Sequence, residues 1–333
     1  MIEIILPILI GFIITLAITP KTIIFLERTG IVGTDIQKFN KPKIPEMGGI
    51  TVLIGFLGAI FSFIAVSNFL TQEISIALLA GITTILIVTI IGILDDLSIL
   101  VKKPIGKIKK IGLKQWQKPL LTLPAAIPLV AIMAGTSTMS IPFIGLVDFG
   151  IWYPLILVPI AIIGASNAFN MLAGLNGLEA GLGSVVLSIL GIYAYGIGET
   201  SASILALSLA ASLIAFIYFN WYPAKILPGD SLTYMIGAAI AVTAIIGNME
   251  KIAFLLFLPW FIEFLLKARS GFKAECFGKL EHNQTLSKPY KKIYSLTHII
   301  MSLGKFKEST IVIALLSMEL IYGIFLLLII NFI

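Results

Sequence analysis

Charged residues are scarce in this sequence. Asp, Glu, Lys and Arg make up 12% of its 333 residues, which is about half of their share in soluble domains. Hydrophobic residues make up 58%, and the mean hydropathy is +1.06. This composition excludes a soluble globular domain and predicts a chain that crosses a membrane many times.

Cysteine and histidine are nearly absent as well. The one cysteine, Cys276, cannot form an intrachain disulfide, and no cysteine-rich zinc site is available. The histidines, His282 and His298, lack the spacing of metal ligands, so zinc is not expected. The net charge is +6, but the basic residues gather in a few segments between apolar runs, so no nucleic-acid partner is expected.

Long apolar runs dominate what is present. Runs of about 17–25 residues can cross a bilayer as helices, and the first one lacks the basic start and cleavage site of a signal peptide. We predict an all-α polytopic membrane protein with about ten transmembrane helices, in which residues 1–333 form a single integral membrane domain. The predicted spans are 2–26, 48–70, 74–94, 119–135, 151–171, 178–197, 200–220, 231–248, 251–267 and 309–332.

The polar segments between these spans alternate in charge. Five of them, with the span ends that border them, contain 22 of the 23 Lys and Arg residues, and only Lys251 lies elsewhere. Because basic residues accumulate in cytoplasmic loops, these segments are predicted to face the cytoplasm, with both termini outside and the protein in the plasma membrane. They are residues 27–47, 95–118, 167–181, 220–230 and 268–308. The segment 135–150, on the other side, predicts a small turn or hairpin without chemistry.

One polar stretch, residues 167–181, stands out between two apolar runs. An unpaired carboxamide in hydrocarbon costs several kcal/mol, so Asn167 and Asn170 are costly there. They are three residues apart and would share one face of a helix. Gly174 and Gly177 would let backbone amides approach a ligand such as a phosphate. The alternative is that these residues only cap helices and allow tight packing.

Acidic residues border two of the spans. Asp95 and Asp96 close the third span, where the helix dipole disfavours negative charge, so a metal or nearby lysines must compensate them. Asp230 begins the eighth span, where it is either a helix cap or a ligand beside Asn170. Mg2+ is commonly held by one or two carboxylates plus substrate phosphates. These three acids and Asn170 form a suitable set of oxygen ligands.

Further candidates lie in the other predicted cytoplasmic segments. Thr34-Asp35-Ile36 belongs to the first, and Glu46 at its end either accepts from sugar hydroxyls or caps the second span. Most lysines of 95–118 suit a general attraction to anionic lipid headgroups, but Lys118 stands at the entry to the fourth span. Lys267-Ala268-Arg269 leaves the ninth span, where it could bind a phosphate or a sugar. Together these groups predict a Mg2+-dependent reaction between a soluble anionic donor and a lipid acceptor.

Four motifs resemble, in this order, those of the polyprenyl-phosphate N-acetylhexosamine-1-phosphate transferases (glycosyltransferase family 4). They are Ile-Pro-Glu, Leu-Asp-Asp, Asn-Ala-Phe-Asn-Met-Leu-Ala-Gly-Leu-Asn-Gly-Leu-Glu-Ala-Gly and Pro-Gly-Asp. The similarity extends to Gly278-Lys279-Leu280-Glu281 and covers almost the whole chain. Bacterial relatives usually have Asp-Gly-Leu-Asp-Gly where this chain has Ala-Gly-Leu-Asn-Gly. In this respect the chain resembles the branch of the dolichyl-phosphate N-acetylglucosamine-1-phosphotransferases of archaea and eukaryotes.

The resemblance implies ten spans, a cytoplasmic site, one Mg2+ (with Mn2+ as a substitute) and a homodimer. The implied reaction is UDP-GlcNAc plus dolichyl phosphate giving dolichyl-diphosphate-GlcNAc and UMP, the first membrane step of lipid-linked oligosaccharide synthesis for N-glycosylation. Asn170 and Asp230 match metal ligands, and Asp95, Asp96 and Lys118 match catalytic positions. Positions that match UDP-GlcNAc contacts are Thr34, Asp35, Ile36, Glu46, Gly174, Asn176, Lys267, Ala268 and Arg269. Positions that match the dolichyl-phosphate region are Lys118, Ser166, Asn167 and Asn170.

Three departures from the family pattern affect this transfer of roles. Eukaryotic members have Arg-His-Arg where this chain has Lys267-Ala268-Arg269, which puts the sugar contacts in question. They carry a Phe, able to stack on uracil, where this chain has Leu227. The segment between Asp96 and Lys118 is also longer here.

The expected mechanism is a displacement at phosphorus. A phosphate monoester has a second pKa of about 6, so the lipid phosphate is largely ionised at neutral pH and needs little help from a base. Asp95 and Asp96 are therefore expected to act mainly through positioning and charge, while Mg2+, Lys267 and Arg269 neutralise the donor diphosphate. A single-step transfer is the preferred interpretation, and a covalent aspartyl-phosphate is the alternative.

Other classes of protein fit the sequence less well. A transporter or flippase for lipid anions needs polar residues along its spans, often with an echo between its halves, and most spans here are purely apolar. A CDP-alcohol phosphotransferase has a spaced Asp-Gly…Ala-Arg…Asp pattern, which is missing. An inactive scaffold would not need the acids and asparagines. The same chemistry with another UDP-N-acetylhexosamine remains open.

Overall fold

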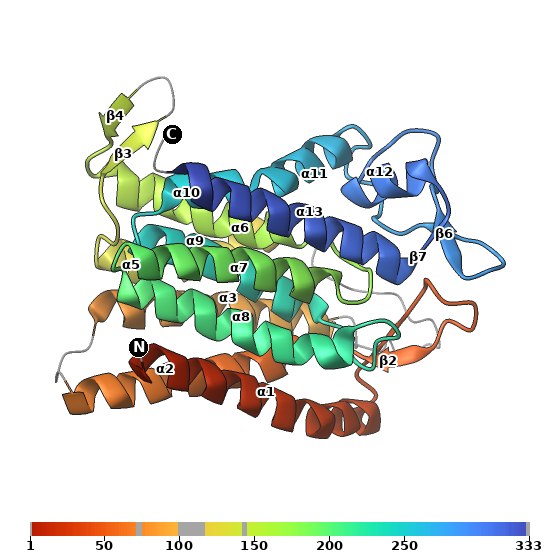
Figure 1. Ribbon diagram of the computed structural model, residues 1–333, viewed down its shortest axis with the longest axis horizontal. Coiled ribbons are helices and arrows are strands. Elements are labelled where there is room, and N and C mark those ends of the chain that lie inside the picture. Colours follow the sequence, from red (N-terminus) through yellow and green to blue (C-terminus); the bar gives the residue numbers. More distant parts are fainter. Residues whose placement is uncertain (1, 71–74, 99–116, 142–144, 331–333) are drawn as a thin grey trace.

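A computed structural model describes residues 2–70, 75–98, 117–141 and 145–330, and it shows helices running side by side along one axis (Figure 1). Seven helices in these ranges are long and apolar enough to cross a membrane. The predicted all-α class is confirmed. The seven are α1 (Ile2–Thr29), α2 (Gly49–Leu70), α3 (Ile76–Ser98), α7 (Leu178–Gly196), α8 (Thr200–Asn220), α9 (Gly229–Ile246) and α13 (Glu308–Ile329).

The other three predicted spans are helical but broken, because prolines remove backbone donors and clash with the preceding turn. The fourth consists of α4 (Gln117–Thr122), the 3-10 turn η1 (Leu123–Ala126) and α5 (Ile127–Ala131). The fifth consists of a π-helical turn, η2 (Tyr153–Leu157), followed by α6 (Val158–Phe169), and the ninth of α10 (Glu250–Leu256) and α11 (Leu258–Ala268). The count of ten crossings therefore stays a prediction.

Helix α9 forms the centre of the bundle. It packs against α3, α6, α7 and α8, and 89% of its span is buried, against 22% for α1 and 33% for α13. Small residues allow this packing. A Cβ on Gly237 would lie 2.3 Å from the carbonyl oxygen of Ala165, so α6 and α9 meet backbone to backbone. The residues of α9 are thus held in place by the four helices around it.

The connections gather at the two ends of the bundle (Figure 1). At one end lie the antiparallel pair β1 (Val32–Thr34) and β2 (Lys43–Pro45), the sheet β5 (Lys279–Leu280), β6 (Thr285–Ser287) and β7 (Phe306–Lys307), and α12 (Leu296–Leu303). At the other end lie the predicted hairpin, β3 (Thr138–Ile141) and β4 (Gly145–Asp148), the start of α1 and the end of α13.

The described parts of the five segments predicted to face the cytoplasm lie at the same end of the bundle, the end that carries β1 and α12 (Figure 1). Helix α3 continues to Ser98, so Asp95 and Asp96 lie within its last turn rather than in the loop predicted for 95–118. The remainder of that loop up to residue 116, with six of its lysines, lies outside the described residues. Which side of the membrane this end faces stays a prediction.

Candidate active site

Asp96 joins the end of α3 to the beginning of α9. Its side chain is buried; Oδ1 accepts a hydrogen bond from the backbone N–H of Asp230 at 2.7 Å, and Oδ2 accepts one from Ser231 at 3.1 Å. The first N–H groups of a helix lack partners within the helix and attract negative charge. Asp96 therefore caps α9 from a distant part of the chain. A Cβ on Gly92 would lie 2.6 Å from the Cα of Ser231, so glycine allows this approach.

Lys118, at the start of α4, lies between two carboxylates. Its Nζ is 2.7 Å from Oδ2 of Asp95 and 2.8 Å from Oδ2 of Asp230. Asp95 is buried, whereas the side chains of Lys118 and Asp230 keep 21% and 25% of their surface exposed. Carboxylates that share one site repel each other unless a cation lies between them. The ammonium of Lys118 provides this compensation. The sequence predicted either a metal or a nearby lysine in this role.

Asn170 follows the last turn of α6 and contacts Asp230. Its Nδ2 donates to Oδ1 of Asp230 at 3.1 Å, and its Oδ1 accepts from the hydroxyl of Thr233 at 3.1 Å. Thr233 lies one turn after Asp230 on α9. The two predicted metal ligands are therefore adjacent. A half-turn of the carboxamide would place its oxygen, in place of its nitrogen, beside the Asp230 carboxylate.

The predicted acceptor residues on α6 differ in their accessibility. Ser166 is buried, and its hydroxyl donates to the carbonyl of Ile162 at 2.7 Å, so it belongs to the helix packing. Asn167 is partly exposed; its Nδ2 lies 2.8 Å from the carbonyl oxygen of Ile163 and 3.3 Å from the hydroxyl of Thr122 on α4. Asn167 thus links α6 to the helix that carries Lys118. This position favours Asn167 over Ser166 as a contact for dolichyl phosphate.

The glycine-rich stretch turns sharply between α6 and α7. Gly174 and Gly177 have φ angles of +113° and +84°, which favour glycine. The N–H of Gly174 donates to Oε1 of the buried Glu179 at 2.7 Å, and that of Gly177 donates to Asn220 at 3.1 Å. These amides stabilise the turn itself. A Cβ on Gly174 would lie 2.7 Å from the ring of Phe277, so this turn also packs against the segment 268–308.

Asn176 lies inside a polar cluster and is 3% exposed. Its Nδ2 donates to Asp35 at 3.3 Å, its Oδ1 accepts from the N–H of Ala224 at 3.0 Å, and its own N–H donates to Glu308 at 2.6 Å. Lys38 completes the cluster with Nζ 3.1 Å from Oδ2 of Asp35 and 2.5 Å from Oε2 of Glu308. Asn176 and Asp35 thus hold four segments together, a role that the sequence did not predict.

The other predicted nucleoside contacts surround this cluster. Thr34 and Ile36 are exposed on either side of the buried Asp35, and Glu46 is partly buried, with Oε2 2.7 Å from the place that a Cβ on Gly33 would take. Beside Asp35 lies a pocket of about 440 Å³, whose lining includes Lys38, Tyr222, Gln284 and Leu280. Pockets of about 300–1,000 Å³ suit small ligands. The structure therefore provides room for a ligand next to these residues.

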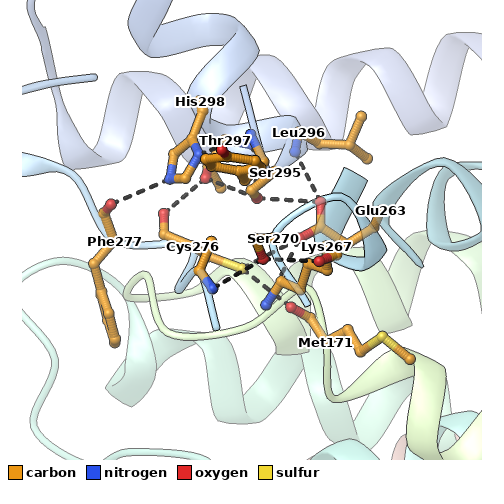
Figure 2. A network of polar contacts seen from close by, with 12 residues as sticks. Met171, Glu263, Lys267, Ser270, Cys276, Phe277, Ser295, Leu296, Thr297 and His298 are labelled. Carbon is orange, nitrogen blue, oxygen red and sulfur yellow. Dashed lines mark hydrogen bonds and ion pairs between the residues drawn. The ribbon is translucent and has the colours of Figure 1, made fainter. Parts of the chain in front are cut away.

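Lys267 lies in the last turn of α11, and Ala268 and Arg269 are exposed at its end. The Nζ of Lys267 is 3.8 Å from Oε1 of Glu263, one turn earlier. Figure 2 shows these two side chains in a network with Cys276, Ser295 and His298 of the segment 268–308. Within the described ranges, Arg269 makes no ion pair. The structure thus joins Lys267 to a buried network and leaves Arg269 at the surface.

The residues around Asp230 fit a hard cation such as Mg2+. Their candidate ligand atoms are the oxygens of Asp95, Asp230, the Asn170 carboxamide and the Thr233 hydroxyl, and the ammonium of Lys118 lies beside them. Among the described residues, no three side chains of His, Cys, Asp or Glu gather as a complete metal cage. A site with two carboxylates suits Mg2+, which usually keeps waters and binds substrate phosphates as well.

Several residues of these clusters were not singled out from the sequence. Glu179, Glu263 and Glu308 are buried acids at or within apolar helices. Ionisable residues in such helices are rare and usually functional. The three glutamates could therefore have been identified in the sequence as acids within or beside apolar runs. Thr233 carries no comparable signal, because threonines in apolar helices commonly bond to their own backbone.

Known proteins are similar to this chain over much of its length. A model of glycosyl transferase family 4 matches residues 76–248. A protein of Saccharolobus solfataricus, provisionally named UDP-N-acetylglucosamine–dolichyl-phosphate N-acetylglucosaminephosphotransferase, is 39% identical over 325 residues, which cover 96% of this chain and 95% of that one. A protein of Sulfolobus acidocaldarius with the same provisional name is 38% identical over 326 residues, which cover 96% and 94%.

A bacterial relative is similar over a shorter length. The phospho-N-acetylmuramoyl-pentapeptide-transferase of Clostridium perfringens is 32% identical over 273 residues, which cover 79% of this chain and 81% of that one. The family resemblance of the four motifs is confirmed. Because the family model spans half of the chain and its relatives span nearly all of it, the chain belongs to glycosyl transferase family 4.

Proposed function

We propose that this protein transfers GlcNAc-1-phosphate from UDP-GlcNAc to dolichyl phosphate or another polyprenyl phosphate, with release of UMP. The observation that carries this proposal is the convergence of Asp95, Lys118, Asn170 and Asp230 where the helices α3, α4, α6 and α9 meet. These are oxygen ligands and one ammonium, gathered at the end of an apolar bundle. The archaeal relatives, whose names state this activity, support the same assignment.

The reaction balances as a displacement at phosphorus. An oxygen of the lipid phosphate forms a bond to the β-phosphorus of UDP-GlcNAc, the bond from that phosphorus to the bridging oxygen breaks, and UMP leaves with the bridging oxygen. At neutral pH the lipid phosphate already carries most of the negative charge that an attacking oxygen needs. No side chain has to remove a proton for the attack to proceed.

The two substrates would occupy different parts of the site. Asn167 on α6 contacts Thr122, one turn after Lys118 on α4, and this pair of helices suits the phosphate of a lipid that enters from between helices. The pocket beside Asp35 suits the nucleoside of the donor. The reacting phosphates would then meet near Asp230 and Asn170. Holding both groups in place supplies much of the acceleration in such transfers.

Charge is the second contribution of the site. Mg2+, when bound by Asp230 and Asn170, supplies positive charge to the donor diphosphate. Lys118 balances the carboxylates of Asp95 and Asp230, which would otherwise repel the incoming phosphates. Asp96 acts on the backbone of Asp230 rather than on substrate, and it is therefore a positioning residue.

The proposal includes the surroundings of the site. The chain would cross the plasma membrane ten times, with the site facing the cytoplasm, where nucleotide sugars are made, and with both termini outside. A homodimer and the role in lipid-linked oligosaccharide synthesis are part of the same proposal. The segments rich in Lys and Arg support the orientation.

The test uses purified protein, UDP-GlcNAc labelled in the sugar, Mg2+ and dolichyl phosphate. The proposal predicts a labelled lipid that mild acid hydrolyses, and UMP in equal amount. A panel of UDP-N-acetylhexosamines identifies the preferred sugar, since the relatives include enzymes named for different donors. Label that crosses a vesicle membrane without UMP release would contradict the proposal and indicate a transporter.

A further inference from the structure

The ammonium groups of Lys118 and Lys267 are held in different ways. Lys118 has two carboxylate oxygens within 2.8 Å, so its N–H groups are engaged. Lys267 is more buried, with 13% of its side chain exposed against 21% for Lys118, but its Nζ is 3.8 Å from Oε1 of Glu263. This distance exceeds that of a hydrogen bond. Within the described part of the chain, no hydrogen bond uses the Lys267 ammonium, so its three donors remain available to an anion.

Glu263 itself is completely buried and fully engaged by the segment 268–308. Its Oε2 accepts hydrogen bonds from the N–H of Leu296 at 2.8 Å and from the hydroxyl of Ser295 at 3.1 Å (Figure 2). The thiol of Cys276 lies 3.5 Å from its Oε1. A buried carboxylate is costly without such partners. These contacts therefore give Glu263 one defined position.

Cys276 extends this network to the glycine-rich stretch. Its thiol is also 3.1 Å from the carbonyl oxygen of Met171, next to Asn170, and its own carbonyl accepts from Thr297 at 2.7 Å. Burial raises the pKa of this thiol to about 11, so at neutral pH it keeps the proton that it donates. The network thus fixes the end of α11 relative to the residue beside the proposed cation site.

We propose that Glu263 is a positioning residue for Lys267. The buried carboxylate attracts the ammonium and fixes its direction, but it lies too far away to take up its hydrogen bonds. Lys267 then presents three free donors to the phosphate oxygens of a nucleoside diphosphate sugar. This inference rests on the proposed function, because the donor named there supplies the anion. It goes further in assigning a role to a residue that touches no substrate.

The test is a double-mutant cycle of Glu263→Gln and Lys267→Gln. Glu263→Gln removes the charge and keeps the shape of the side chain. We expect it to weaken binding of UDP-GlcNAc about tenfold, in the dissociation constant and in KM, and to leave the KM for polyprenyl phosphate unchanged. In the Lys267→Gln background, Glu263→Gln should have no further effect on binding, since Glu263 acts through Lys267.

The control is Glu281→Gln. Glu281 is an acid of the same segment that accepts from Ser287 and Lys305 at the surface, and its replacement should leave donor binding unchanged. Additive effects of Glu263→Gln and Lys267→Gln would overturn the inference, as would equal losses for donor and lipid. If Glu263→Gln does not fold, Ser295→Ala decides instead. It should weaken donor binding about threefold, and only while Lys267 is present; no weakening would overturn the inference.

The outcome separates this inference from the proposed function. Wild-type protein that binds UDP-GlcNAc but releases no UMP contradicts the proposed reaction, while the binding cycle still decides the role of Glu263. Wild-type protein that turns over, with a Glu263→Gln variant that binds the donor equally well, contradicts only the inference. Wild-type protein that does not bind UDP-GlcNAc contradicts both.

Discussion

Oδ1 of Asp96 lies 2.7 Å from the backbone nitrogen of Asp230, and this contact joins the last turn of α3 to the first turn of α9. Asp230 also contacts Lys118 and Asn170, so the position of two further side chains depends on this cap. Adjacent acids in one motif have therefore taken different tasks. Asp95 pairs with Lys118, and Asp96 holds the backbone on which the proposed cation ligand stands.

Asp96→Asn should lower stability and activity together. The amide of asparagine has one oxygen for two backbone N–H groups, and its NH2 group would face the second N–H. The loss of this hydrogen bond lowers the free energy of unfolding by about 1–3 kcal/mol. We expect a lower thermal midpoint in detergent and a transfer rate reduced at least about tenfold. Asp148→Asn is the control, because Asp148 also accepts from a backbone N–H, that of Gly150, but at the opposite end of the molecule. Lost activity with unchanged stability would mean that Asp96 touches the reacting groups.

Gly92→Ala should separate α3 from α9. The new Cβ would lie 2.6 Å from a backbone atom of Ser231, which cannot move without shifting the first turn of α9. Overpacking of this kind costs about 1–3 kcal/mol, and activity should fall with it. In the control, Gly164→Ala on α6, the Cβ meets no atom within 4 Å, and alanine favours the helix. Equal stability of the two variants would contradict the close packing of α3 on α9.

Removal of divalent cations should stop the reaction. We expect chelation to abolish transfer and Mg2+ or Mn2+ to restore it, since the oxygens around Asp230 suit hard cations. Asp230→Asn should raise the Mg2+ concentration for half-maximal rate at least about tenfold, because it removes a charged ligand. Asp148→Asn should leave that concentration unchanged. Full turnover after exhaustive chelation would refute the cation site.

The only cysteine should be unreactive in the folded protein. Cys276 is buried, and the burial raises its pKa to about 11. A raised pKa leaves the thiol protonated at neutral pH, so alkylation, which needs the thiolate, should accelerate only as the pH approaches 11 or as the chain unfolds. Mass spectrometry after maleimide treatment at pH 7 checks this. Alkylation at the rate of free cysteine would contradict the buried network of Figure 2.

This low reactivity makes the topology measurable with single introduced cysteines. Arg269→Cys, at the end with α12, should react with an impermeant maleimide only when the cytoplasmic face is exposed. Thr136→Cys, beside the hairpin at the opposite end, should react in intact cells. Both sites are exposed in the structure. The reverse pattern would place the site outside the cell and contradict the proposed orientation.

The sequence predicted the main features for identifiable physical reasons. Long apolar runs fix the helical class, since only helices satisfy the backbone within one segment in lipid. Acids and carboxamides near such runs are costly, and this cost identified Asp95, Asn170 and Asp230, which the structure brings together. The breaks in the fourth and ninth spans were readable in principle, because Pro124, Pro128 and Pro259 interrupt those runs.

Other features depend on how distant segments meet, and no local pattern specifies them. The cap from Asp96 to α9 needs the register of α3 against α9. The cluster of Asn176 with Asp35 and Glu308 joins residues more than 100 positions apart. Its asparagine matches a ligand contact in the family pattern, which stays a prediction, while in the structure its side chain forms hydrogen bonds between segments. Sequence alone cannot distinguish these two uses of a carboxamide.

The most direct test of the account follows the β-phosphate of the donor. Purified protein would receive UDP-GlcNAc labelled with 32P at the β-position, together with Mg2+ and dolichyl phosphate. The account predicts that the label appears in the lipid product, that UMP is released unlabelled in equal amount, and that no phosphorylated aspartate accumulates. Label that stays in UDP would mean that the sugar moves without its phosphate, and label trapped on Asp95, Asp96 or Asp230 would mean a covalent intermediate; either result would contradict a direct displacement of UMP by the lipid phosphate.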